Sequence, residues 1–242
     1  MEHDSMRRWA SEHAAFLGAE KIKKLENYAD LLNKTNEKFN LTGITSINGI
    51  IKQLIIGSIE PVINLNVPRG TMYADIGSGA GIPGIPIGIV HDNLQGLLVE
   101  SNKKKASFII SVIRELDLGN LSVYHGRIEE YLAEGTREQF NIVFSRALGD
   151  PYYVIELGAP LLNSDGLLYI YSHLNPNELP AYVLQHGADC GLSLAAAATK
   201  RAHGIADTGL LFLKNGNTDN RFPRKISIIK RDIMRHTRSS AT

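Results

Sequence analysis

Four glycines and two prolines follow a short apolar run at residues 74–86, ADIGSGAGIPGIP. Glycine removes the side chain where the backbone must turn sharply or approach another group closely. Pro83 and Pro86 set φ at the start of the helix that the next residues predict. A strand, a bare loop and a helix start in this order are typical of a cofactor site.

The spacing of the glycines separates two classes of cofactor. Gly77, Gly79 and Gly81 form G-x-G-x-G, whereas a nicotinamide dinucleotide site has G-x-G-x-x-G, with the pyrophosphate on the helix N-terminus. Asp75 precedes the loop, and a carboxylate facing the loop would repel a pyrophosphate. It would suit a cationic ligand that carries an amine and a sulfonium, so these residues favour S-adenosylmethionine.

A second acid stands at the end of the next apolar run, LLVE. Glu100 follows Gly77 by 23 residues, and at that place a carboxylate can accept hydrogen bonds from both ribose hydroxyls of a cofactor. Nicotinamide cofactors and S-adenosylmethionine share this use, so Glu100 alone does not separate them. Its other interpretation is an acid that caps the following helix.

The surrounding pattern predicts an α/β fold with a helical extension. Residues 1–66 are expected to form an N-terminal helical region, with apolar residues at helical spacing between residues 6 and 40. In residues 67–242 five apolar runs alternate with helical patterns, which predicts a doubly wound, mostly parallel sheet. The later runs at 209–215 and 225–231 are interpreted as further strands. Ligands of such a sheet bind outside the carboxyl ends of its strands, where the glycine loop falls.

Composition limits the class of protein. The chain has 242 residues, 43% of them hydrophobic, and a formal net charge of +1, which argues neither for nor against a nucleic acid. Cys190 is the single cysteine, so the sequence predicts no internal disulfide and no zinc site, which fits the cytoplasm. The N-terminus does not have the pattern of a secretory signal, and no apolar run approaches the roughly 20 residues of a membrane span.

The positive charges are concentrated near the end of the chain. Between residues 214 and 238 only Asp219 and Asp232 oppose eight basic residues, namely Lys214, Arg221, Arg224, Lys225, Lys230, Arg231, Arg235 and Arg238. Such an arginine-rich block suits phosphates. A second group, Lys21, Lys23 and Lys24, is equally well interpreted as a solvated face.

Several segments together resemble a known family. They are FNLTGITS, DIGSGAGIPGIPIGIV, VESNKKKASFI, GRIEEY, FNIVFSRALG and RFPRK, in this order from about Glu37 to Lys225. They resemble the bacterial ribosomal RNA small-subunit methyltransferase G family, also called glucose-inhibited division protein B. The resemblance implies a class I S-adenosylmethionine-dependent methyltransferase with a Rossmann-like fold that forms 7-methylguanosine in 16S ribosomal RNA and acts as a monomer.

The resemblance also assigns roles to residues. Glu100 would bind the ribose where the family usually has Asp, and Ile128 and Glu129 would flank the adenine. The expected cofactor contacts are Asp75, Gly77, Ser78, Gly79, Gly81, Ile82, Glu100, Ile128, Glu129 and Arg146. The expected RNA contacts are Arg127 at the mouth of the cleft and, in the tail, Arg224 and Lys225, which Pro223 should hold outward.

The implied reaction needs few catalytic groups. The N7 atom of guanine has a free lone pair and no proton, so no general base is required, and alignment with the sulfonium methyl carries much of the rate. A stacked guanine would have to be exposed or flipped and then held by an aromatic or arginine plane. Arg146, which ends the fourth strand, is the catalytic candidate for this role. For Arg146 and Arg127 the alternative is a structural salt bridge.

The chain departs from the family at four positions. Gln53 and Gly57 replace a usual His and the Asp of an Asp-Ser pair, and Ser172 and His173 replace a Lys-Gly pair after the fifth strand. These positions are expected near the RNA-facing side, so a different RNA target or an RNA-binding role without catalysis stays open. A nicotinamide-dependent oxidoreductase is a further alternative, but the chain lacks the wider glycine spacing and a catalytic Tyr/Lys or His arrangement.

Overall fold

The computed structural model describes residues 3–13, 17–206 and 208–239. Its centre is a seven-stranded sheet with the strand order β3-β2-β1-β4-β5-β7-β6. The strands are β1 (Met72–Ile76), β2 (Gln95–Glu100), β3 (Leu121–His125), β4 (Phe140–Arg146), β5 (Leu162–Tyr171), β6 (Leu192–Leu194) and β7 (Leu210–Lys214). β1 to β5 pair in parallel, and β7 is antiparallel to both of its neighbours. The predicted fold class, a doubly wound and mostly parallel sheet, is confirmed.

The N-terminal part of the chain is helical, as predicted. It contains α1 (Asp4–Glu12), α2 (Ala19–Asn36), α3 (Ile47–Gly49), the π-helix η1 (Ile50–Ile56), α4 (Gly57–Ile59) and the 3₁₀ turn η2 (Glu60–Val62). Ser46 begins this second group, because its Oγ accepts a hydrogen bond from the Gly49 N–H at 3.1 Å. The expected boundary near residue 67 lies in the loop between η2 and β1.

The remaining helices connect the strands. They are α5 (Gly84–Val90), α6 (Lys103–Glu115), α7 (Ile128–Ala133), α8 (Pro151–Gly158), α9 (Ala181–Asp189), α10 (Ala197–Ala202) and α11 (Ile226–Ser239), with 3₁₀ turns η3 (Ala159–Leu161) and η4 (Pro176–Glu178). Local caps explain two of the starts. Asn102 Oδ1 accepts from the N–H groups of the first turn of α6, and Asp150 does the same for Tyr152 in α8.

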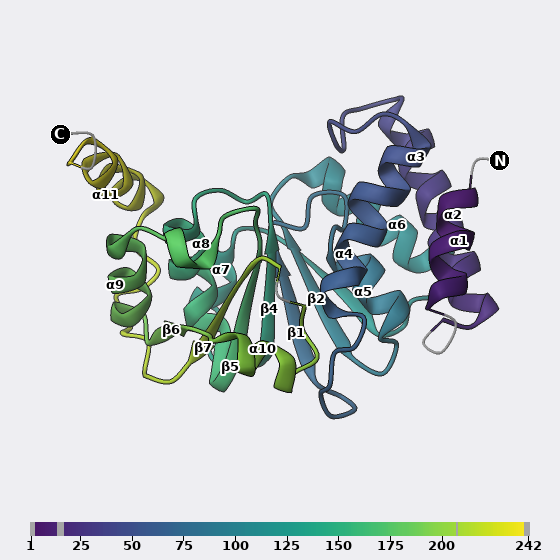
Figure 1. Cartoon of the computed structure of the whole chain (residues 1–242). Coiled ribbons are helices and arrows are strands. Elements are labelled where there is room, and N and C mark those ends of the chain that lie inside the picture. The colour runs from purple at the N-terminus through teal and green to yellow at the C-terminus, as the bar shows by residue number, and fades with distance from the viewer. Residues whose placement is uncertain (1–2, 14–16, 207, 240–242) are drawn as a thin grey trace.

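Two hydrophobic cores cover the two faces of the sheet. The first joins the N-terminal helices, α5 and α6 to side chains such as Tyr73, Phe144 and Tyr169. The second joins α7, α8 and α9 to residues of alternate orientation on the same strands, such as Ala74 and Val143. The N-terminal helices therefore belong to the core of the sheet, and Figure 1 places them at the opposite end of the molecule from α9 and α11.

One predicted element is wrong. Residues 225–231 were interpreted as a strand, but they begin helix α11. Ile226, Ile229 and Ile233 repeat at helical spacing, and Ile229 is fully buried. A short run rich in isoleucine fits either structure, and packing of this helix against α8 decides it. Within the described residues, no helix has both the length and the apolar character required to cross a bilayer.

One hydrogen bond ties the N-terminal helices to the glycine loop. The hydroxyl of Tyr28, fully buried on α2, donates to the carbonyl of Ala80 at 2.8 Å. Tyr28→Phe should lower the free energy of unfolding by about 1–2 kcal/mol, because it leaves a buried carbonyl without a donor. Denaturant titration measures this. Tyr153→Phe is the control, since the Tyr153 hydroxyl has no hydrogen bond among the described residues, and equal effects of the two changes would contradict the prediction.

Candidate active site

The glycine loop after β1 has a backbone that only glycine adopts freely. Gly77, Gly79 and Gly81 have φ values of +72°, +59° and +91°. A Cβ at Gly77 would also lie 2.5 Å from Leu148 Cδ1, and one at Gly81 would lie 2.4 Å from Ile85 Cδ1. The glycines therefore allow the loop to turn and to pack closely against Leu148 and Ile85.

Asp75 supports this loop from below. Its side chain is fully buried, and Oδ2 accepts a hydrogen bond from the Gly84 N–H at 2.9 Å. Its Oδ1 is buried without a partner in the described structure. Burial raises the pKa of Asp75 to about 7, against the lowering effects of the Gly84 N–H, the Ser78 side chain and, least, the Arg146 charge; the Glu100 charge adds to the rise. Asp75 was predicted to contact the cofactor, but it is not among the residues that line the cavities described below.

Glu100 is hydrogen-bonded to the glycine loop. It is 7% exposed, and its Oε2 accepts from the Gly79 N–H at 2.7 Å, while Oε1 accepts from the Asn102 N–H at 2.6 Å. Asn102, rather than Glu100, is the side chain that caps α6. Each carboxylate oxygen keeps further acceptor capacity, so binding of ribose hydroxyls by Glu100 stays a prediction.

A cavity of about 80 Å³ lies beside the loop at the carboxyl ends of β1 and β2. It brings together three residues predicted from the GRIEEY segment, Arg127, Ile128 and Glu129, with Gly77. Tyr153 and Leu157 of α8 form another wall, which the sequence did not indicate. An apolar slot with polar groups at its edge suits a flat aromatic ring.

A second cavity, of about 290 Å³, shares Gly77 with the first. It is lined by the predicted residues Ser78, Gly79, Ile82 and Arg146. It is also lined by residues that had been given no role, Leu41, Thr42, Gly43, Leu54 and Lys105 among them. Leu41 to Gly43 and Lys105 lie in segments that carried the family resemblance, which was the available signal for them.

A third cavity, of about 520 Å³, shares Arg146 with the second. Its lining includes all four positions at which the sequence departs from the family pattern, Gln53, Gly57, Ser172 and His173. Glu60, Tyr169, Tyr171 and Thr208 contribute as well. Residues 53–61 of the N-terminal region and residues 169–173 and 206–209 thus surround one space beside Arg146.

Arg146 separates the second cavity from the third and is bound by the π-helix. Its Nη2 donates to the Gln53 carbonyl at 2.6 Å, and its Nη1 donates to Ser58 Oγ at 3.0 Å and to the Leu54 carbonyl at 3.4 Å. A π-helix alters the usual pairing of backbone carbonyls, and such turns recur at functional sites. Its guanidinium also lies 5.6 Å from the centre of the Tyr171 ring. Burial lowers the pKa of Arg146, and the structure gives it no carboxylate partner among the described residues, so the salt-bridge interpretation is wrong.

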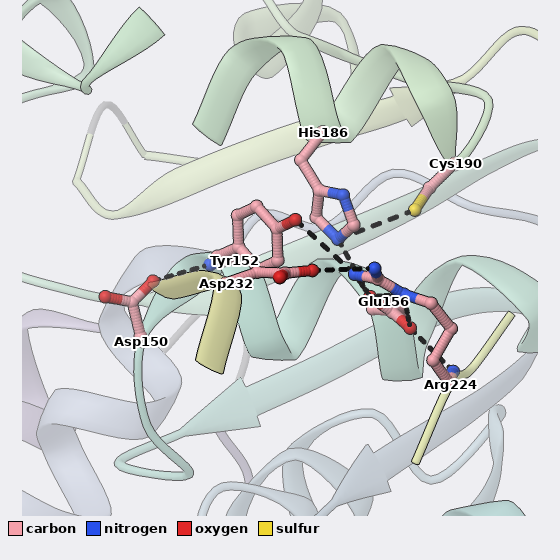
Figure 2. A network of polar contacts seen from close by, with 7 residues as sticks. All are labelled: Asp150, Tyr152, Glu156, His186, Cys190, Arg224 and Asp232. Atoms are coloured by element: carbon pink, nitrogen blue, oxygen red, sulfur yellow. Dashed lines mark hydrogen bonds and ion pairs between the residues drawn. The ribbon is translucent and has the colours of Figure 1, made fainter. Parts of the chain in front are cut away.

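The tail residues lie elsewhere, and one expectation about them is wrong. Arg224 was expected to point outward, but its guanidinium and its backbone N–H both bind the buried carboxylate of Glu156, at 2.7 and 2.6 Å (Figure 2). A buried carboxyl group keeps its charge when a cation pairs with it, and Arg224 supplies that cation from 68 residues away in the chain. Lys225 is exposed, as expected.

The fold and the site together define a class of protein. A sheet of this order with one antiparallel strand, a glycine loop after β1 and an acid at the end of β2 belongs to the class I S-adenosylmethionine-dependent methyltransferases. In the part of the chain that the structure describes, no group of three or more His, Cys, Asp or Glu side chains could hold a metal ion.

Comparison with known proteins identifies the family. The family model described as rRNA small subunit methyltransferase G matches residues 21–180. A relative of that name from Lachnoclostridium phytofermentans is 35% identical over 156 residues, which is 64% of either chain. Another, from Carboxydothermus hydrogenoformans, is 31% identical over 226 residues, 92% of this chain and 96% of that one. The chain belongs to the ribosomal RNA small subunit methyltransferase G family, as its motifs implied, and its cofactor is S-adenosylmethionine.

The buried carboxyl of Asp75 predicts a pH dependence of cofactor binding. Its pKa in the folded protein, about 7, lies above the ordinary value of 3.8, so its ionisation opposes folding, and stability is lost as the pH rises from 3.8 to about 7. A cationic cofactor favours the ionised form. If binding lowers this pKa by about one unit, the affinity for S-adenosylmethionine should rise up to about tenfold from low to high pH around 7.

Calorimetric titration at several pH values measures this dependence. Asp75→Asn is the matched control, because an amide oxygen can still accept from the Gly84 N–H but carries no titrating charge. Its affinity profile should be flat in this range. A profile that is equally steep in the variant would assign the dependence to another group.

Proposed function

We propose that this protein transfers the methyl group of S-adenosylmethionine to N7 of a guanine in small-subunit (16S) ribosomal RNA. One observation supports this most: the three cavities follow one another, joined by Gly77 and then by Arg146. A cofactor with an adenosine end and a methionine end needs two adjoining spaces, and the acceptor base needs a third beside the methyl group.

The cavities suit these three parts in order. The adenine ring fits the 80 Å³ slot, between Ile128 and the edge formed by Glu129. The methionine part fits the 290 Å³ cavity over the backbone of the glycine loop, with the Asp75 charge below it. Glu100, at the end of β2, is assigned to the ribose hydroxyls between them.

The acceptor base fits the 520 Å³ cavity. When bound, S-adenosylmethionine supplies an electrophilic methyl group, and guanine N7 supplies its own lone pair. The protein then has to hold the base in line with that methyl. Arg146 lies at the junction of the two spaces with Tyr171 next to it, so we assign Arg146 to positioning of the base.

The departures from the family pattern support a second candidate target. Gln53, Gly57, Ser172 and His173 all line the cavity assigned to the base. Polar groups that contact a base select its identity, so a guanine in another sequence context, or another RNA, is the alternative. We also propose that the protein acts as a monomer in the cytoplasm, where ribosomal RNA is made in bacteria. Arg127 and Lys225 remain the predicted RNA contacts.

Mapping of 7-methylguanosine tests the target directly. Ribosomal RNA from cells with and without this protein is compared by chemical cleavage at 7-methylguanosine and by mass spectrometry of nucleosides. One guanine of the small subunit should lose its methyl group in the absence of the protein and regain it when purified protein and S-adenosylmethionine are added. Methylation of a different RNA would favour the second candidate, and binding of NADH without binding of S-adenosylmethionine would exclude both.

The cofactor assignment predicts the effect of a change in the glycine loop. Gly79 has φ +59°, and the nearest atom to a Cβ there would be the Gly77 carbonyl oxygen at 4.0 Å. Gly79→Val therefore fails through backbone strain at a β-branched residue and not through a collision of its Cβ. We expect S-adenosylmethionine to raise the melting temperature of the native protein and to leave that of Gly79→Val unchanged. Gly79→Asn, which tolerates this backbone region better, should keep part of the shift. A full shift in the valine variant would contradict the placement of the loop.

The position of Arg146 predicts a loss of activity beyond any loss of stability. Arg146→Ala should lower kcat about 100-fold, because the base is no longer held in line. It should also cost about 1–3 kcal/mol of stability, since the carbonyls of the π-helix lose their donor. Activity per folded molecule is measured at a temperature well below the melting transition. If that activity equals the native value, Arg146 only supports the π-helix.

A further inference from the structure

A cationic helix lies outside the three cavities. Helix α11 follows the part of the chain that the family model matches, residues 21–180. Figure 1 shows it beyond α8 and α9 at one end of the molecule. Its basic residues have no place in the site described above, so their role is a separate question.

The helix is fixed to the domain by a buried ion pair. Glu156, which is fully buried on α8, accepts hydrogen bonds from Arg224 and lies 3.2 Å from His186 Nε2 of α9 (Figure 2). Burial alone would raise the pKa of Glu156, but the hydrogen bonds from His186 and Arg224 outweigh burial and lower this pKa to about 2. Arg224 Nη1 also binds Asp232 of α11 at 2.8 Å. One arginine thereby joins α8 to the first turns of α11.

Ring stacking adds a second attachment. His186 lies flat on Tyr152 of α8, with 3.6 Å between the ring centres, and His236 of α11 stacks on Tyr182 of α9 at 4.6 Å. Ile229 of α11 is fully buried. The inner face of α11 is therefore occupied by contacts with α8 and α9.

The outer face of α11 is basic. Lys230, Arg231 and Arg238 are exposed and have no carboxylate partner in the described structure, and at 3.6 residues per turn they fall within an arc of about 100°. Asp232, the acid of this helix, is 19% exposed and bound to Arg224. The charge of the outer face is therefore not compensated from within the helix.

We propose that this outer face of α11 binds the phosphate backbone of the RNA substrate, an inference that rests on the proposed function. Arginine and lysine side chains bind phosphates without selecting a base. A helix that lies in a membrane surface exposes a broad apolar face. In α11, Ile229 is buried, the other isoleucines are partly buried, and Met234 is its exposed large apolar residue. A nucleic-acid backbone therefore fits this surface better than a lipid bilayer does.

Helix α8 connects this surface to the proposed cofactor site. Helix α8 uses Tyr152 and Glu156 to hold α11, and it uses Tyr153 and Leu157 to line the 80 Å³ cavity. RNA that lies across α11 would thus be guided along α8 toward the mouth of the site, where Arg127 stands. Because α11 is already packed against α8 and α9, RNA binding would cost little conformational entropy of the helix.

A triple variant tests this surface. Lys230→Ala, Arg231→Ala and Arg238→Ala together should weaken binding of a small-subunit RNA fragment on the order of 10- to 100-fold at about 0.1 M salt. They should also reduce the slope of log affinity against log salt by about two to three units. The matched control removes three exposed cations from the N-terminal helices, Arg8, Lys23 and Lys34, at the other end of the molecule. Its RNA affinity should stay within about threefold of the native value, the size of change expected without direct phosphate contacts.

Three further measurements separate the outcomes. S-adenosylmethionine affinity and the melting temperature should be unchanged in the α11 variant, and kcat at saturating RNA should be kept while KM for RNA rises. The charge-preserving variant Lys230→Arg, Arg231→Lys, Arg238→Lys should bind RNA as the native protein does. An unaltered salt slope in the alanine variant, or a loss confined to the N-terminal control, overturns the proposal.

Two results distinguish a wrong binding partner for α11 from a wrong proposed reaction. If the native protein binds vesicles of anionic phospholipid and the α11 variant loses that binding while its RNA affinity is unchanged, the surface is a membrane contact and the proposal is overturned. If ribosomal RNA carries no methyl group from this protein but the α11 variant still loses RNA affinity and salt slope, the RNA surface stands and the proposed reaction falls.

Discussion

A glycine-rich loop is positioned mainly through its backbone, and this constraint governs the whole site. Three separate parts of the protein hold the loop after β1. Tyr28 donates to the Ala80 carbonyl, Glu100 accepts from the Gly79 N–H, and Asp75 accepts from the N–H of Gly84 at the start of α5. The other N–H groups of the loop are also bound within the protein: those of Gly77 and Ser78 donate to the Val99 carbonyl of β2, and those of Gly81 and Ile82 donate to the Ser78 carbonyl. The N-terminal helices and the sheet therefore both position the loop.

Arg146 extends the same principle to the substrate side. A strand end supplies the guanidinium, and the π-helix supplies the carbonyl oxygens that hold it. Because guanidinium is planar and donates in fixed directions, this arrangement sets the distance between β4 and the N-terminal segment. The positions at which the chain differs from its family, such as Gln53 and His173, line the space on the substrate side of Arg146. These departures line the space where the base is assigned, and Glu100, in place of the usual Asp, is the expected departure on the cofactor side.

The carboxylates of the structure show how burial assigns roles to similar groups. Glu156 is buried with Arg224 and His186 and keeps its charge, with a pKa lowered to about 2. Asp75 is equally buried, but no cation pairs with it among the described residues, and burial raises its pKa to about 7 in spite of the Gly84 N–H and the Ser78 side chain. Glu156 can therefore act as a permanent anchor for the C-terminal helix. Asp75 is poised so that a cationic ligand can change its protonation state.

The sequence by itself determined the alternation of strands and helices, the glycine loop and the family. These features are local, since apolar periodicity and glycine spacing report backbone conformation directly. It also placed Arg146 correctly at the carboxyl end of a central strand and Ile128 and Glu129 beside Gly77, because parallel strands bring their ends to one edge.

Only the tertiary structure decided which groups became partners. A basic residue after a proline gives no sign of a buried glutamate 68 positions earlier, so Arg224 was assigned to RNA although Glu156 holds it. The run at residues 225–231 had the composition of a strand, and a helix formed because α8 offered an apolar surface for Ile229 and a partner for Arg224. Leu41, Thr42 and Lys105 line the 290 Å³ cavity because the turn after α2 and helix α6 both pack beside the glycine loop, which the sequence did not show. Contacts between distant segments are set by packing and by compensation of buried charge, and neither leaves a periodic signal along the chain.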